Sequence, residues 1–159
     1  MTAIPWVVFR DAAPELADAI RTRFVSARHH VLATLRADGS PRVSGTEVQF
    51  FEADLTVGSM PGSVKARDLR RAASYALHAH TGDGSMDGGD AKVAGIAVEV
   101  TDPADLARFL DGRGMPDGPF ELFRLLLAEA VLTAVHPDGD RLVITSWRPG
   151  VGLRVSERR

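Results

Sequence analysis

The feature of this sequence that most constrains its fold is a series of short strand-like segments joined by tight turns. Residues 30–35 have the two-residue period of a strand, residues 38–41 form a turn, and residues 42–51 predict a second strand. Connections this short join antiparallel neighbours, because parallel strands need long crossovers. Six or seven strands are expected, the others at residues 55–59, 74–80, 92–100 and 141–147, with residues 122–135 compatible with either a strand or a helix.

Three short helices are expected around these strands. The first starts with a capping Asp11 followed by Pro14 and Glu15, and it carries an apolar stripe at residues 16, 20 and 24. The expected fold class is therefore mainly β, an antiparallel barrel with peripheral helices. The other two helices are predicted over residues 63–72 and 103–110, and loops are predicted over residues 81–90 and 112–119.

Composition limits the kind of protein this chain can be. A length of 159 residues suits one domain, expected to span residues 1–159. The net charge of −2 provides no overall field for nucleic acid or a membrane surface, so neither is an expected partner. The absence of cysteine excludes disulfides and thiolate metal sites, and the apolar runs fall short of the roughly 20 residues that cross a bilayer. The first residues lack a signal-peptide pattern, so we expect a cytoplasmic location.

Residues 58–71 carry the strongest chemical signal. They predict the end of a strand, a tight loop and a basic helix, with Ser59 and Ser63 beside the helix start and Lys65 in its first turn. The N-terminus of a helix exposes unpaired N–H groups and the positive end of the dipole, which favours phosphate. A bound phosphate would also offset the unfavourable position of a cation in the first turn. The alternative interpretation is a solvated surface helix without a ligand.

The segments before this helix resemble those of the pyridoxamine 5'-phosphate oxidase-like superfamily. Residues 31–35 (Val-Leu-Ala-Thr-Leu) and 38–43 (Asp-Gly-Ser-Pro-Arg-Val) are similar to the first hairpin of that family. The order of strands, Gly-Ser loop and basic helix holds as far as residue 77. The resemblance implies a six-stranded antiparallel split β-barrel that forms a homodimer. It also implies that FMN, or the deazaflavin coenzyme F-420, binds at the dimer interface.

The resemblance also implies positions for the cofactor. The second strand would pass beside the flavin, Ser63 and Lys65 would hold its phosphate, and a late Trp-Arg pair would approach across the interface. Arg67, with the arginines at 70 and 71, would suit the acidic tail of the deazaflavin coenzyme. The cofactor-binding residues expected in this way are Ser44, Gly45, Thr46, Ser59, Met60, Ser63, Lys65, Arg67, Trp147 and Arg148.

Three positions depart from the oxidase itself. Ser44, Gln49 and Val64 stand where that enzyme has cations, so oxidation of vitamin B6 is not expected. The expected function is that of a flavin-dependent oxidoreductase using FMN on an unknown small organic substrate. A deazaflavin-dependent reductase of the same fold and a non-enzymatic module that binds flavin or haem are the alternatives. No catalytic residue is assigned, but Arg42 and Arg148 are candidates for stabilising a reduced, anionic flavin.

Two other groups of polar residues resemble parts of metal sites. Residues 83–88 imitate the start of a calcium loop, but Ala94 stands at the twelfth position, where such a loop has Glu. His78 and His80 lie two apart on a predicted strand and share a face, but no third ligand accompanies them. We therefore expect no metal site, and a structural or dimer-facing role for the two histidines.

Overall fold

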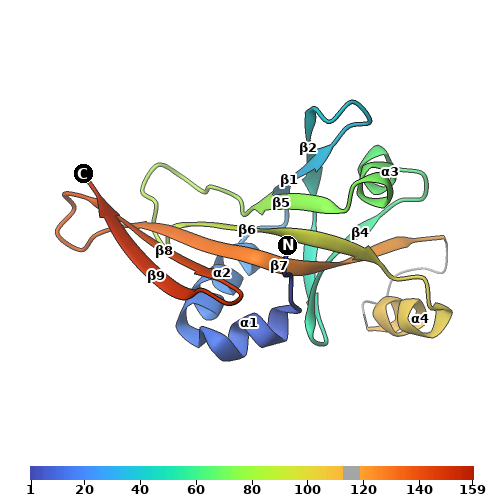
Figure 1. Cartoon of the computed structure of the whole chain (residues 1–159), viewed down its shortest axis with the longest axis horizontal. Coiled ribbons are helices and arrows are strands. Elements are labelled where there is room, and N and C mark those ends of the chain that lie inside the picture. Colours follow the sequence, from blue (N-terminus) through green and yellow to red (C-terminus); the bar gives the residue numbers. More distant parts are fainter. Residues whose placement is uncertain (113–118) are drawn as a thin grey trace.

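The computed structural model describes residues 1–112 and 119–159. Within them nine strands form one sheet, in which the order is β2-β1-β5-β6-β7-β4-β3 and β8 and β9 extend the sheet beside β7 (Figure 1). The mainly β, antiparallel fold with peripheral helices is confirmed. The strands are β1 (His30–Leu35), β2 (Pro41–Thr46), β3 (Val48–Phe51), β4 (Asp54–Ser59), β5 (Ser74–His78), β6 (Asp90–Glu99), β7 (Glu121–Val135), β8 (Leu142–Arg148) and β9 (Gly152–Arg158). The helices described are α1 (Trp6–Ala12), α2 (Pro14–Val25), α3 (Val64–Arg71) and α4 (Pro103–Asp111).

The sheet curls into a barrel because the two ends of its strand order are joined in the chain. β2 and β3 lie at opposite ends of that order, yet Glu47 is the single residue between them. Strands joined so closely can hold these positions only if the sheet bends round to bring its ends together. This meeting point, formed by residues 44–49, is called the barrel seam below.

Strand β7 is the central element of the sheet and is 15 residues long. One edge pairs with β6, while the other pairs first with β4 and then with β8. Its Leu and Ala content also suits a helix, but partners on both edges satisfy its backbone groups as a strand. The register with β6 shifts at Gly95, where the carbonyl oxygen of Leu126 approaches so closely that a side chain has no room.

Helices α1 and α2 pack next to each other against the sheet (Figure 1). The predicted apolar stripe of α2 is confirmed, because Leu16, Ile20 and Phe24 are buried. Pro14 and Glu15 lie in the first turn of α2 as predicted, but the predicted cap was wrong. Asp11 lies near the end of a separate preceding helix, and α2 follows Ala13 without a side-chain cap. None of the helices within residues 1–112 and 119–159 has the length and apolar character that a membrane crossing requires.

The main core joins the N-terminal helices to distant strands through aromatic side chains. Phe9 of α1 is fully buried and packs against Trp147 of β8, with ring centroids 5.0 Å apart. Trp6 packs edge-on against Phe9 and against Phe50 of β3, with centroid distances of 5.2 and 4.7 Å. These contacts hold β3, at one end of the sheet order, against the same core as β8.

The two later helices agree with the prediction. Ser63 caps α3 by accepting a hydrogen bond from the N–H of Ala66, and Asp102 caps α4 by accepting bonds from the first N–H groups of that helix. Helix α4 buries Phe109 in a separate small core, with Phe51 on one side and Phe120 on the other.

The strand boundaries differ from the prediction in several places. The strand predicted over residues 42–51 is divided at Glu47 into β2 and β3, and β5 ends at His78. The strand at residues 142–148 is not the last, because β9 pairs with it along its whole length. The predicted loop over residues 112–119 lies almost entirely outside the described residues.

Candidate functional site

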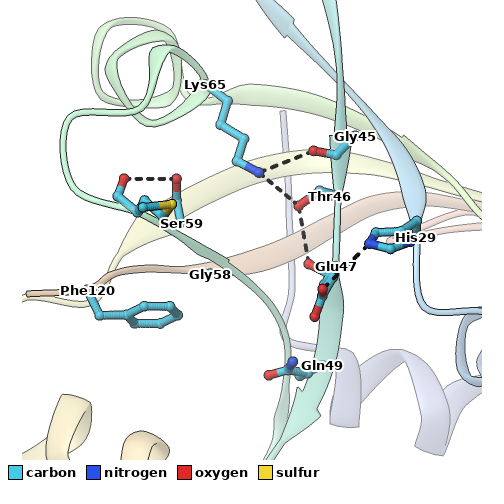
Figure 2. A pocket seen from close by; sticks show the side chains of 10 residues that line it. His29, Gly45, Thr46, Glu47, Gln49, Gly58, Ser59, Lys65 and Phe120 are labelled. Atoms are coloured by element: carbon cyan, nitrogen blue, oxygen red, sulfur yellow. Dashed lines mark hydrogen bonds and ion pairs between the residues drawn. The ribbon is translucent and has the colours of Figure 1, made fainter. Parts of the chain in front are cut away.

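A cavity of about 320 Å³ opens at the barrel seam, beside β4 and the start of α3 (Figure 2). It is lined by segments far apart in the sequence, because the curl of the sheet places β2, β3 and β4 around one space. Among the residues predicted to bind the cofactor, the cavity contains Gly45, Thr46, Ser59, Met60 and Lys65. Its other lining residues are His29, Glu47, Gln49, Gly58 and Phe120.

Lys65 is the cation of this cavity. Its Nζ donates hydrogen bonds to the carbonyl oxygen of Gly45 and to Oγ1 of Thr46, each at 3.3 Å (Figure 2). Both acceptors are uncharged, and no carboxylate in the described part of the chain forms an ion pair with Lys65. Burial lowers the pKa of Lys65, while the charge of nearby Glu47 opposes this shift. A partly buried ammonium group that forms no ion pair is suited to bind an anion.

Two serine hydroxyls lie between the end of β4 and the start of α3. Ser59 Oγ donates to Ser63 Oγ at 2.5 Å, and it also lies 3.2 Å from the carbonyl oxygen of Met60. Gly62 has a φ of +73°, which glycine adopts without strain and which lets the chain turn sharply into the helix. The hydroxyls and the first N–H groups of α3 are together the kind of donors that bind phosphate.

Two cations near α3 are held by a buried carboxylate. Asp68 accepts hydrogen bonds from Arg42 Nε and Arg71 Nη2, both at 2.7 Å, and from Thr34 Oγ1 at 2.9 Å. Burial alone would raise the pKa of Asp68, but these three bonds outweigh it and lower the pKa to about 2. The charge of Arg42 is therefore balanced within the chain, and its role in stabilising a reduced, anionic flavin stays a prediction.

Arg70 is also balanced by the chain's own acids. Its Nη2 donates to Glu99 at 2.5 Å and to Glu121 at 2.8 Å, and these bonds raise the pKa of Arg70. Glu121 also accepts a hydrogen bond from the N–H of Gly62 at 3.3 Å, which ties the loop before α3 to this ion pair. Arg67 is exposed, and it has no carboxylate partner among the residues described. It is thus the one cation of the predicted tail-binding group (residues 67, 70 and 71) that the described structure leaves unpaired.

The cavity also contains polar groups that the sequence did not predict there. Glu47 Oε1 accepts from Arg28 Nε at 2.9 Å and lies 3.6 Å from His29 Nε2 (Figure 2). Gln49 Oε1 is buried and has no hydrogen-bond partner among the described residues. In the sequence Gln49 stands out only as a replacement for Lys, and Glu47 falls within a single predicted strand. Neither position carries a local signal, because the curl of the barrel brings both to the cavity.

Two glycines shape the walls of the cavity. At Gly45 a side chain would meet no atom within 4 Å, so the seam is open at this point. At Gly58 a Cβ atom would lie 2.2 Å from Cζ of Phe120, so the ring packs directly on the backbone of β4. The cavity therefore combines an open backbone surface and an aromatic wall with the polar groups around Lys65.

The remaining predicted residues lie outside this cavity. Ser44 pairs with Leu32 in the β1–β2 ladder, and Ser63 lies next to Ser59. Trp147 belongs to the main core, and Arg148 forms an ion pair with Glu129 on β7. A single chain does not bring these last two to the cavity, and their approach from a partner subunit stays a prediction.

The clusters considered for metals have other partners. His78 Nδ1 lies 2.6 Å from the carbonyl oxygen of Ala79, and His30 Nδ1 accepts a hydrogen bond from the backbone N–H of His80. A cluster of His136, Asp138 and Asp140 lies in the β7–β8 turn. The guanidinium of Arg141 bonds to all three of its side chains, so a cation of the chain itself occupies the centre of this cluster.

Comparison with known proteins identifies the fold. The sequence matches no family model and has no significant match among curated proteins. A pyridoxamine 5'-phosphate oxidase-related, FMN-binding protein from Nostoc punctiforme has a TM-score of 0.66 at 14% identity, covering 92% of this chain and 96% of its own. PhzG from Burkholderia lata, solved with tetrahydrophenazine-1-carboxylic acid, has a TM-score of 0.63 at 17% identity, covering 98% and 93%. HutZ, a haem storage protein from Vibrio cholerae, has a TM-score of 0.53 at 20% identity, covering 73% and 89%.

The chain is therefore a split β-barrel. Its structural neighbours are pyridoxamine 5'-phosphate oxidase-like, FMN-binding split-barrel proteins, which confirms at the level of the fold the resemblance seen in the sequence. The neighbours include both an oxidase-related protein and a storage protein. The fold alone thus leaves the activity to be argued from the site.

Proposed function

We propose that this protein is an FMN-binding oxidoreductase that acts on a small organic substrate at a homodimer interface. The observation that carries the proposal is Lys65, a partly buried cation in the seam cavity that forms no ion pair with an acid of the described residues. A phosphate monoester is the anion that suits it, because Ser59 lines the same cavity, and Ser63 at the N-terminus of α3 is hydrogen-bonded to Ser59.

The donor set of the cavity fits FMN. Lys65 would contact the phosphate together with Ser63 and the first turn of α3, and the open backbone at Gly45 would leave room for the rest of the molecule. Bound FMN would supply hydride or electron transfer, which explains why the cavity needs few acid–base groups of its own. The chain's part would be to place the cofactor and balance its charge.

FMN fits the cavity better than the deazaflavin coenzyme. The acidic tail of that coenzyme would need cations beyond Lys65, and of the three arginines predicted to meet it, those at 70 and 71 are held by carboxylates of the chain. Arg67 alone offers an unpaired charge among the described residues of this group. Binding of the deazaflavin coenzyme in preference to FMN would overturn this choice while leaving the split-barrel site intact.

An apolar hollow on the sheet supports the homodimer. Val31 and Val43 are 48% and 71% exposed and lie on the neighbouring strands β1 and β2. With Ala33 and Ala76 they line a hollow of about 350 Å³. Grouped, exposed apolar side chains mark interaction surfaces. A second copy of the chain would cover them.

The absorption spectrum of the purified protein, with the extracted cofactor identified by its mass, tests the proposal directly. We expect FMN to co-purify or to bind at micromolar concentration, and light scattering to give the mass of a dimer. Absence of any flavin binding would contradict the proposal.

Lys65→Ala tests the site. A hydrogen bond to a charged group contributes about 1.5–3 kcal/mol, so the Kd for FMN should rise about 10- to 100-fold. The Kd for riboflavin, which lacks the phosphate, should change little. Arg154→Ala is the control, because Arg154 is an exposed cation on β9 and lines neither the cavity nor the hollow proposed for the homodimer. Equal losses for FMN and riboflavin would place the phosphate elsewhere.

A further inference from the structure

Gln49 is an unusual residue in this chain. It is the only side-chain carboxamide in the sequence, which contains no asparagine and no other glutamine. It lies on β3 and lines the seam cavity, in which Figure 2 shows it well separated from Lys65. It also lines an adjoining cavity of about 300 Å³, with which the seam cavity shares Glu47 and Gln49.

The side chain of Gln49 has an unmet hydrogen-bonding requirement. Its Oε1 is buried and has no partner within residues 1–112 and 119–159, whereas the backbone carbonyl of the same residue accepts a bond from Thr56 Oγ1 at 3.0 Å. The strand is therefore satisfied without the carboxamide. A buried acceptor without a donor destabilises a protein, and an apolar side chain of similar size would avoid that cost. Such acceptors are retained at sites where a bound ligand supplies the missing hydrogen bond.

The neighbouring polar groups Glu47 and Thr56 do not donate a hydrogen bond to Gln49 Oε1. Glu47 is an acceptor and already receives a hydrogen bond from Arg28. The hydroxyl of Thr56, the cross-strand partner of Gln49, is used by the backbone. No group among the described residues donates to Oε1 of Gln49 in this structure, so a ligand can supply the missing bond.

We infer that Gln49 is a specificity-determining residue, whose Oε1 turns toward the seam cavity when a ligand binds and there accepts a hydrogen bond from an N–H or O–H group of that ligand. The inference rests on the proposed function and extends it. The ligand carries an anion, which meets Lys65, and a separate hydrogen-bond donor, which meets Gln49. FMN satisfies both requirements, since it has a phosphate together with an imide N–H and ribityl hydroxyls. Analogues without the donor should bind more weakly, because they leave the acceptor buried and unpaired.

Gln49→Met tests this inference with two readouts, because methionine matches the shape of glutamine without its hydrogen-bonding groups. In the cofactor-free protein we expect a higher midpoint of urea unfolding, since the unpaired acceptor is gone. For FMN we expect the Kd to rise about tenfold or more, since the bond to the ligand is lost. Thr56→Val is the matched control on the neighbouring strand. It removes a buried hydroxyl that is satisfied, so it should lower the unfolding midpoint.

The urea midpoint and the Kd for FMN also show which results would overturn the inference. A Gln49→Met variant that is destabilised like Thr56→Val would show that the carboxamide is satisfied in the free protein, which overturns the inference. So would a stabilised variant with an unchanged Kd for FMN. If the unchanged protein binds no FMN, the proposed function fails instead. If the unchanged protein and the Gln49→Met variant bind FMN equally well, only the role given to Gln49 is contradicted.

Discussion

Asp68→Asn probes the ion-pair cluster that joins helix α3 to the first hairpin. The Asp68 side chain is only 3% exposed, and its two oxygens accept bonds from Arg42, Arg71 and Thr34 at 2.7–2.9 Å. Asparagine keeps the shape but removes the charge, and its amide N–H groups would face a guanidinium. The substitution therefore leaves two arginines without their anion while changing little of the packing.

The magnitude follows from the pKa of Asp68. That pKa falls from an ordinary value of 3.8 to about 2, and one pKa unit corresponds to about 1.4 kcal/mol. The ionised carboxylate thus contributes about 2–3 kcal/mol at neutral pH. Breaking a fully buried ion pair costs about 3–5 kcal/mol, but Arg42 and Arg71 are 25% and 41% exposed, so water screens part of the loss. We expect Asp68→Asn to lower the free energy of unfolding by about 2–3 kcal/mol.

Urea unfolding at a series of pH values is the assay. Because the pKa of Asp68 is lowered by folding, its contribution is complete above pH 4 and is lost as the pH falls from about 4 to about 2. The difference between the original protein and Asp68→Asn should therefore be largest at neutral pH and shrink across this range. Asp18→Asn, an exposed acid on α2, is the control and should change stability little. A difference that is independent of pH, or below about 1 kcal/mol at pH 7, would refute the reasoning.

Three further substitutions test the packing of the fold. In Gly95→Ala the new Cβ would lie 1.9 Å from the backbone oxygen of Leu126, so we expect a loss of about 3 kcal/mol or more. In Gly58→Ala the obstacle is the end of the Phe120 side chain, which can rotate away, so the loss should stay below about 1.5 kcal/mol. Equal urea midpoints for these two variants would contradict this distinction. Ser63→Ala removes the cap of α3 and should cost about 1 kcal/mol in thermal unfolding, and an unchanged melting temperature would show that the cap contributes nothing.

The elements that the sequence predicts well are those with local signals. The β1–β2 hairpin turns at Gly39, whose φ of +82° suits glycine, and the caps Ser63 and Asp102 mark the starts of α3 and α4. Each of these signals acts within a few residues, so no distant partner is needed to read it. The Ser59, Ser63 and Lys65 group was recognisable for the same reason, because strand end, loop and helix start follow one another in the chain.

The elements that the sequence predicts poorly depend on distant partners. Strand β7 has helix-forming residues, and its pairing with β4, β6 and β8 decides its conformation. Strand β9 is almost entirely exposed and shows little apolar alternation, so pairing with β8 is what defines it. Glu47 interrupts what resembles one continuous strand because the barrel closes at that residue.

By itself, the sequence determined an antiparallel β fold and a phosphate-binding type of helix start. Only the tertiary structure decided which charges that helix start has available. Arg42 meets Asp68 across 26 residues and Arg70 meets Glu121 across 51, so both are neutralised, while Lys65 reaches only uncharged acceptors. Only the tertiary structure, too, placed Gln49 in the cavity with a buried oxygen that no described residue pairs. The reason is physical: the availability of a polar group depends on every group within hydrogen-bond reach, and the curl of the sheet sets those neighbours.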